Sequence, residues 1–158
     1  MPEKILSRNE LRTVLAKRRA EGHRIVFTNG CFDLMHVGHV RYLDKARRLG
    51  DVLVVGLNTD ASVRSLGKSP ARPIVPDVQR AEVVGALAAV DYIVLFDEPD
   101  PRRLIEEVEP DVLVKGGDWA LGDIIGRDVV ERRGGVVTTI PLVPGISTTA
   151  LIQRIKQS

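Results

Sequence analysis

Two histidines separated by a glycine are the residues of this sequence best suited to chemistry. His36 and His39 are three positions apart, and Gly38 lies between them. Residues at this spacing share one face of a helix, so both imidazoles are expected on the same side. A glycine lets a ligand approach the backbone, and a helix N-terminus offers free N–H donors and partial positive charge. The segment therefore predicts a site that binds phosphate and stabilises charge during phosphoryl transfer.

The same segment has a second interpretation as a zinc site. Cys31, His36 and His39 could supply three ligands to a metal. The remaining histidine, His23, precedes the first predicted strand and is expected at the opposite edge of the sheet. The sequence has no second cysteine, and no clustered carboxylate completes a tetrahedron. We therefore favour Cys31 as a buried or backbone-contacting residue and predict no metal ligated by the protein.

Several other polar residues are candidates for contact with a ligand. Asp33 could bind a substrate hydroxyl or hold its loop through an Asx turn. Lys68, Arg72 and Arg80 lie in or just after a proline-rich loop, residues 67–76. Each of them is by default an ordinary surface cation. Lys68 gains weight because its loop follows a predicted strand and is expected to fold over the site.

A lysine and a hydroxyl-rich turn complete the set of candidates. Lys115 ends an apolar run just before Gly116, and a lysine is costly to bury, so its amine should reach a pocket or solvent. We favour a ligand role for it. Residues 145–149 form a second loop-to-helix turn, in which Ser147, Thr148 and Thr149 could bind phosphate. Ser147 or Thr148 could also simply cap the helix, and the two roles are compatible.

The elements that must position these residues are alternating strands and helices. Apolar runs predict strands over residues 24–28, 52–57, 92–96, 111–115 and 136–140. Helical spacing and capping signals predict helices over 7–21, 36–49, 60–66, 77–89, from 101, over 123–133 and over 147–156. This alternation indicates an α/β fold, a Rossmann-like, doubly wound sheet of five parallel strands. We expect the strand order 3-2-1-4-5.

In such sheets ligands bind beyond the carboxyl ends of the strands, where the strand order reverses. Segments 29–39, 115–118 and 141–149 each follow a predicted strand, so they should meet at one edge of the sheet. Coordinates that separate His36 and His39 from Ser147 and Lys115 would refute this hypothesis.

Length and composition limit the remaining choices. The chain has 158 residues, which suits a single domain over residues 1–158, and a net charge of +2, too small to indicate a nucleic-acid partner. With Cys31 as its single cysteine it can form no internal disulfide. No apolar run approaches the ~20 residues that span a bilayer, and the N-terminal segment does not read as a signal peptide. We expect a cytoplasmic protein that binds no membrane.

Two motifs resemble those of a known family. Residues 30–39 resemble the G-x-F-D-x-x-H-x-G-H signature of the cytidylyltransferase-like nucleotidyltransferases, and residues 146–149 resemble its second motif. Segments 27–33, 72–74, 111–118 and 141–145 are similar to the adenylyltransferase branch of ADP-heptose synthesis. Leu142 occupies a position that is arginine in the glycerol-phosphate cytidylyltransferases, which disfavours CTP.

The resemblance implies a reaction and its partners. AMP would pass from ATP, with Mg²⁺, to D-glycero-D-manno-heptose 1-phosphate, giving ADP-heptose and pyrophosphate for lipopolysaccharide core or related heptose pathways. Many such enzymes carry a fused sugar-kinase domain that this chain lacks, so a separate sugar kinase is expected upstream. A homodimer is also expected.

The resemblance further implies roles for individual residues. His36, His39 and Lys68 would be catalytic. The nucleotide would contact Gly30, Cys31, Phe32, His36, Gly38, His39, Lys115, Gly116, Gly145, Ser147, Thr148 and Thr149. The sugar or its phosphate would contact Asp33, Arg72, Arg80 and Asp118.

Three other functions are alternatives to this reaction. The first is a nucleotidyltransferase that uses CTP or GTP, or another sugar or polyol phosphate. The second is a ligase, because class I aminoacyl-tRNA synthetases also carry a His-x-Gly-His turn, although this chain has no Lys-Met-Ser-Lys-Ser-like segment. The third is a nucleotide-binding regulator without catalytic activity, which would bind ATP but release no pyrophosphate.

Overall fold

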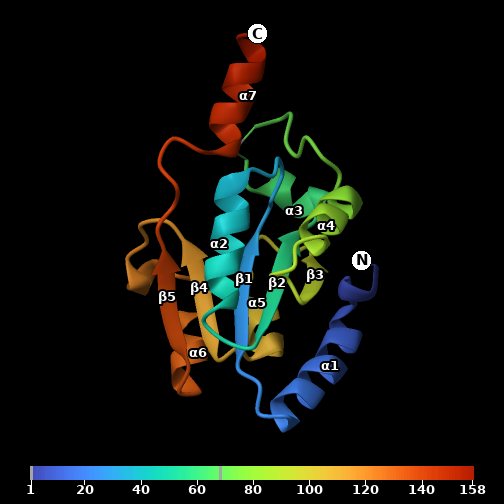
Figure 1. Ribbon diagram of the computed structural model, residues 1–158, viewed down its shortest axis with the longest axis vertical. Coiled ribbons are helices and arrows are strands. Elements are labelled where there is room, and N and C mark those ends of the chain that lie inside the picture. Colours follow the sequence, from blue (N-terminus) through green and yellow to red (C-terminus); the bar gives the residue numbers. More distant parts are fainter. Residues whose placement is uncertain (1, 68) are drawn as a thin grey trace.

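The computed structural model describes residues 2–67 and 69–158, which form a five-stranded parallel sheet (Figure 1). The strands are β1 (Ile25–Gly30), β2 (Val52–Asn58), β3 (Tyr92–Phe96), β4 (Val112–Gly116) and β5 (Val136–Ile140). Their order is β3-β2-β1-β4-β5, and every pair is parallel. The predicted fold class and strand order are confirmed.

Helices cover both faces of this sheet. They are η1 (Pro2–Lys4), α1 (Arg8–Ala20), α2 (Val37–Arg47), α3 (Asp60–Ser65), α4 (Asp77–Gly85), α5 (Arg102–Val108), η2 (Leu121–Asp123), α6 (Arg127–Arg132) and α7 (Thr148–Lys156). Figure 1 shows α2 in front of the sheet and α5 and α6 behind it. None of the helices described between residues 2 and 158 is both long and apolar enough to cross a membrane.

The alternation of side chains along each strand divides the core into two layers. Val26 and Val55 belong to the cluster that includes Leu43 of α2. Phe27 and Val54 belong to the cluster on the other face, with residues of α1, α5 and α6. Successive side chains in a strand point to opposite faces, so each position of a strand can be assigned to the α2 side or the α5 side of the sheet.

The ends of several elements differ from the sequence-based expectations. β1 continues to Gly30, because its ladder with β2 extends to the pair Gly30 and Leu57. Pro101 precedes α5 as its cap instead of being its first helical residue. Helix α6 begins only after Gly126, whose φ of +90° is open to glycine, and residues 121–123 form a 3-10 turn before it. Ser7 and Glu10 form a capping box at the start of α1.

The segments that follow the strands gather at the carboxyl edge of the sheet. In Figure 1, α7 projects from this end of the molecule, and the proline-rich loop runs beside its first turn. The N-terminus of α2 lies at the same edge, directly after β1. The fold therefore brings together the three segments predicted to form the site.

Candidate active site

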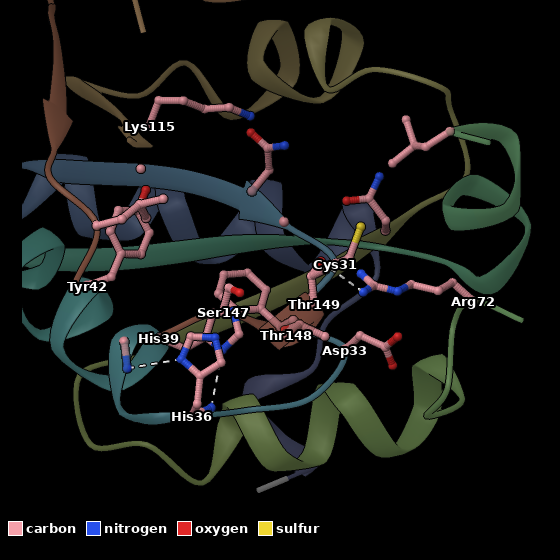
Figure 2. Close-up of a pocket in the computed structure, with 18 of the residues that line it drawn as sticks. Cys31, Asp33, His36, His39, Tyr42, Arg72, Lys115, Ser147, Thr148 and Thr149 are labelled. Carbon is pink, nitrogen blue, oxygen red and sulfur yellow. Dashed lines mark hydrogen bonds between the residues drawn. The ribbon is translucent and has the colours of Figure 1, made fainter. Parts of the chain in front are cut away.

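A cavity of about 540 Å³ opens at the carboxyl edge of the sheet. Its lining comes from all three predicted segments and from the loops after β2 and β3. It includes Asn29, Gly30, Cys31, Phe32, Asp33, His36, Gly38, His39, Tyr42, Asn58, Arg72, Asp100, Lys115, Gly116, Leu142, Ile146, Ser147, Thr148 and Thr149. Figure 2 shows His36 and His39 close to Ser147, with Lys115 on another wall of the cavity. The predicted meeting of remote loops is confirmed.

The two imidazoles are held as a stacked pair at the N-terminus of α2. Their ring centroids are 3.9 Å apart, with an angle of 25° between the planes. Nδ1 of His36 accepts a hydrogen bond from the Gly38 amide at 3.1 Å, and Nδ1 of His39 accepts one from the His36 amide at 3.4 Å. An Nδ1 that accepts must be unprotonated, so in the neutral ring the proton is on Nε2. Each ring therefore keeps one N–H donor for a ligand.

Both rings are neutral at pH 7. Burial lowers the pKa of His36 below its ordinary value. Burial and, to a smaller extent, the neighbouring His36 lower the pKa of His39 to about 4. A neutral imidazole with its proton on Nε2 donates a hydrogen bond without adding charge. The pair is suited to hydrogen-bond oxygens that gain charge during a reaction.

Acidification from pH 6.5 to pH 4 should destabilise the protein through His39. Its pKa in the folded state, about 4, lies below the ordinary 6.5, so the unfolded chain takes up the proton first. This contribution to stability is complete above pH 6.5 and is lost as the pH falls towards 4. We expect the urea-unfolding free energy of the wild type to fall more steeply over this range than that of His39→Gln. An NMR titration of the His39 ring with a midpoint near 6.5 would contradict the expectation.

Gly38 is required by the packing around it. A Cβ atom at this position would lie 2.8 Å from the ring of His36 and 3.6 Å from Cγ2 of Ile146. The imidazole of His36 can therefore keep its place over the Gly38 amide only when residue 38 has no side chain. The space that the glycine leaves is part of the cavity.

The first turn of α7 is linked to both of the other loops. Ser147 caps the helix, with its Oγ accepting from the Ala150 amide at 3.0 Å. Thr148 Oγ1 donates to the Leu34 carbonyl at 3.2 Å, and Thr149 Oγ1 accepts from Arg72 Nη2 at 3.2 Å (Figure 2). Capping by Ser147 is confirmed, and the hydroxyls lie in the cavity wall where a phosphate could bind.

Asp33 holds the proline-rich loop in place. Its side chain is buried, and its carboxylate accepts from the amides of Ile74 and Val75 at distances between 2.9 and 3.0 Å. Of the two roles predicted for it, the structure shows the loop-holding one, but the loop it holds is a distant one and not its own. Asp33 in this way sets the position of Arg72, which lines the cavity.

The structure corrects the role predicted for Arg80. It was expected to contact the substrate, but it is fully buried and does not line the cavity. Its guanidinium donates to the carbonyls of Val75, Cys31 and Asn58 and to the Asp60 carboxylate, at 2.6–2.9 Å. These partners belong to the loop after β1, the end of β2, the start of α3 and the proline-rich loop. Arg80 therefore joins the walls of the cavity from behind.

Two other predicted residues are placed differently, and a third is not among the described residues. Asp118 is exposed and does not line the cavity, and Gly145 likewise lies outside its lining. Lys68 falls outside the described residues. Phe32, in contrast, is buried with a positive φ of 49°, and its ring lies 5.3 Å from that of His39. It supports the imidazole pair from one side.

The sequence analysis missed three polar residues that line the cavity: Tyr42, Asn58 and Asp100. Asn29 also lines it, and it belongs to a segment predicted to lie at this edge, although no role was predicted for it. The Tyr42 hydroxyl donates to the Val114 carbonyl at 3.3 Å and is 2.6 Å from Thr28 Oγ1, which therefore donates to it. Burial raises the pKa of Tyr42 to about 12. Its spacing from His39 is the helical i, i+3 interval, a signal that could have identified it.

The zinc interpretation finds no support in the arrangement of the side chains. Within residues 2–67 and 69–158, no three histidine, cysteine or acidic side chains lie close enough together to hold a metal ion.

A cavity at the carboxyl edge of a parallel sheet, with donors for phosphate oxygens, is suited to transfer a nucleotidyl group from a nucleotide to a second substrate. These features place the protein among the nucleotidyltransferases. A family model described as cytidylyltransferase-like matches residues 27–154. The chain belongs to this family, as its signature segments predicted, and it is a nucleotidyltransferase.

Individual relatives agree with this assignment. Bifunctional protein HldE of Syntrophotalea carbinolica is 55% identical over 152 residues, and that of Geobacter sulfurreducens is 51% identical over 152 residues. Each alignment covers 96% of this chain but 31% of the relative, so the chain spans about a third of the length of these proteins.

Solved structures show the same fold. A lipopolysaccharide core biosynthesis protein from Thermoplasma volcanium superposes with a TM-score of 0.62 at 30% identity, over 77% of this chain and 98% of that one. A pantothenate synthetase from Thermus thermophilus gives a TM-score of 0.61 at 17% identity, over 89% of this chain and 62% of the other. The second similarity is one of fold alone.

Proposed function

We propose that the protein transfers AMP from ATP to D-glycero-D-manno-heptose 1-phosphate, releasing ADP-heptose and pyrophosphate. The observation that carries the proposal is the pair of neutral imidazoles, each with a free Nε2–H, lining the same cavity as the first turn of α7. The heptose branch is supported by the 55% identity to bifunctional protein HldE and by the structural similarity to a lipopolysaccharide core biosynthesis protein.

The reaction needs alignment and charge stabilisation more than proton transfer. The phosphate of the acceptor has a second pKa near ~6, so it is mainly a dianion at pH 7 and needs no general base. One of its oxygens forms a bond to the α-phosphorus of ATP, while the bond from that phosphorus to the bridging oxygen breaks and its electron pair leaves with pyrophosphate. His36 and His39 would donate to the phosphate oxygens as charge redistributes.

Mg²⁺ is proposed to enter with ATP and to neutralise part of the triphosphate charge. Among the residues that line the cavity, the carboxylates are those of Asp33 and Asp100, and Asp33 already accepts from two backbone amides. This donor set fits a cation held mainly by phosphate oxygens.

The reaction also implies other activities. A sugar kinase, in another protein or in another part of a longer chain, must supply the heptose 1-phosphate. ATP is a cytoplasmic substrate, and we propose that the enzyme acts in the cytoplasm. The homodimer that the family resemblance implies stays a prediction.

Incubation with one nucleotide and one acceptor tests the proposal directly. We expect pyrophosphate and a product with the mass of ADP-heptose when ATP is combined with one anomer of D-glycero-D-manno-heptose 1-phosphate. GTP, CTP and the other anomer serve as comparisons in the same assay. Faster turnover with CTP would favour the rival transferase, and ATP binding without pyrophosphate from any sugar phosphate would favour a regulator.

A further inference from the structure

The cavity has two flanks of different chemistry on either side of the imidazole pair. One flank, next to β4 and β5, offers the apolar side chains of Leu142, Val143 and Ile146 and the backbone of Gly116. The other, at the ends of β1, β2 and β3, sets the polar side chains of Asn29, Asn58 and Asp100 among the apolar ones of Leu66, Pro99 and Pro101. A flat nucleobase fits the first flank, and a polyhydroxylated molecule fits the second, because hydroxyls need partners that both donate and accept.

Asn29 and Asn58 lie on the same face of the sheet, on neighbouring strands. Asn29 pairs with Gly56 in the ladder between β1 and β2, and Asn58 is two residues beyond Gly56. Phe27 and Val54, which precede them by two and four residues, belong to the core layer on the α5 side. Alternation therefore places both amides on that side, on strands about 4.8 Å apart.

The Asn58 amide is fixed in position by a short chain of hydrogen bonds. Asn58 is 4% exposed, and its Nδ2 donates to Ser62 Oγ at 3.0 Å. Ser62 Oγ in turn donates to the Glu98 carbonyl at 2.8 Å. The same chain therefore positions the amide and ties down the loop between β3 and α5. A buried amide held in this way at a cavity wall is a preorganised partner for a ligand.

Asp100 completes the group from that loop. One of its carboxylate oxygens accepts from the Arg102 amide at 2.9 Å, where α5 begins, and a carboxylate has further acceptor positions. Asp100 thus stands at the start of α5, whose residues Leu104 and Ile105 pack on the same side of the sheet as the two amides. Two amides and a carboxylate together can accept from and donate to several hydroxyls of one molecule.

The geometry points to Asn29, Asn58 and Asp100 as the subsite that binds the hydroxyl groups of the sugar acceptor. The assignment rests on the proposed function and names the side chains that select the acceptor. The nucleoside then occupies the flank formed by Gly116, Leu142 and Ile146, and the two phosphates meet at the imidazole pair between the flanks. Lys115, the next side chain on the same face, marks the boundary between the two subsites.

Steady-state kinetics with ATP and D-glycero-D-manno-heptose 1-phosphate test the assignment. Asn29→Ala and Asn58→Ala should each raise the KM for the sugar phosphate about five- to tenfold, and Asp100→Ala about tenfold or more, since a hydrogen bond to a charged group is stronger. The KM for ATP, and the Kd for ATP measured by calorimetry without acceptor, should stay within about twofold. A rise in one KM at constant kcat is the mark of lost binding.

A variant at an exposed position and a control variant complete the test. Asp100 is exposed, so its variant should fold even if loss of the link from Asn58 to Ser62 impairs the second variant. Asn9→Ala, at an exposed position of α1 far from the cavity, is the matched control and should change neither KM. A raised KM for ATP with an unchanged KM for the sugar phosphate would overturn the subsite and leave the proposed function standing. A wild type inactive with every sugar 1-phosphate would overturn both.

Discussion

Removal of either imidazole donor is expected to reduce kcat by about 10²-fold or more, the usual cost of losing one hydrogen-bond donor to a charged transition state. His36→Asn and His39→Gln are the variants of choice. Asparagine is a good N-cap residue, so it can replace the acceptor that His36 offers to the Gly38 amide while losing the reach of Nε2. Glutamine can likewise replace the acceptor that His39 offers to the His36 amide.

The third histidine provides the matched control. His23 lies before β1, at the opposite end of the strand, where its ring contacts Arg18 and Glu21. His23→Gln should leave kcat unchanged in the pyrophosphate-release assay. Near-normal turnover in both His36→Asn and His39→Gln would show that the pair takes no part in catalysis, whereas a rise in KM for ATP alone would limit it to ground-state binding.

Replacing Arg80 with methionine is expected to lower the free energy of unfolding by about 3 kcal/mol or more. The side chain of Arg80 is 0% exposed, and the change removes the donors to three backbone carbonyls. It also removes one donor to the Asp60 carboxylate, which keeps the Asp77 amide. Unpaired buried acceptors carry the full cost of their lost hydration. Urea denaturation followed by circular dichroism measures the effect, which is a large part of the stability of a typical domain.

A surface arginine distinguishes this effect from the general loss of a charge. Arg48 also forms an ion pair, with Asp44, but its side chain is 77% exposed. Arg48→Met should change the unfolding midpoint little, since exposed ion pairs add little to stability. An Arg80→Met protein as stable as the wild type would show that the hydrogen bonds behind the cavity are not needed to hold its walls together.

The sequence was sufficient to predict the fold, because the signals that define it are local. The strands over residues 92–96 and 136–140 are uninterrupted runs of apolar and β-branched residues, and the structure has these same bounds. The helix ends were harder to place. Helix α4 was expected to continue to residue 89 but ends at Gly85. The apolar pattern misled the prediction because it continues past Gly85, where the backbone hydrogen bonds become those of turns.

The site was predictable where chemistry and backbone signals coincide, as at His36, His39 and Ser147. It was not predictable where burial decides the role of a charged residue. Arg80 and Arg72 look equivalent in the sequence, yet one is buried behind the cavity and the other lines it. Asn29 and Asn58 sit in apolar strands, and only the strand order and the register show that their side chains share one face of adjacent strands.

The strand order also links ligand binding to the completeness of folding. The cavity is built from residues that follow β1, β2, β3, β4 and β5, so it exists only after the first strand has paired with both the second and the fourth. A partly folded chain cannot assemble it. Any molecule that fills the cavity therefore binds the native state alone and stabilises it. Once its concentration exceeds Kd, this stabilisation grows with the logarithm of the concentration, and the melting temperature rises with it. Thermal shift thus reports occupancy even where turnover is absent.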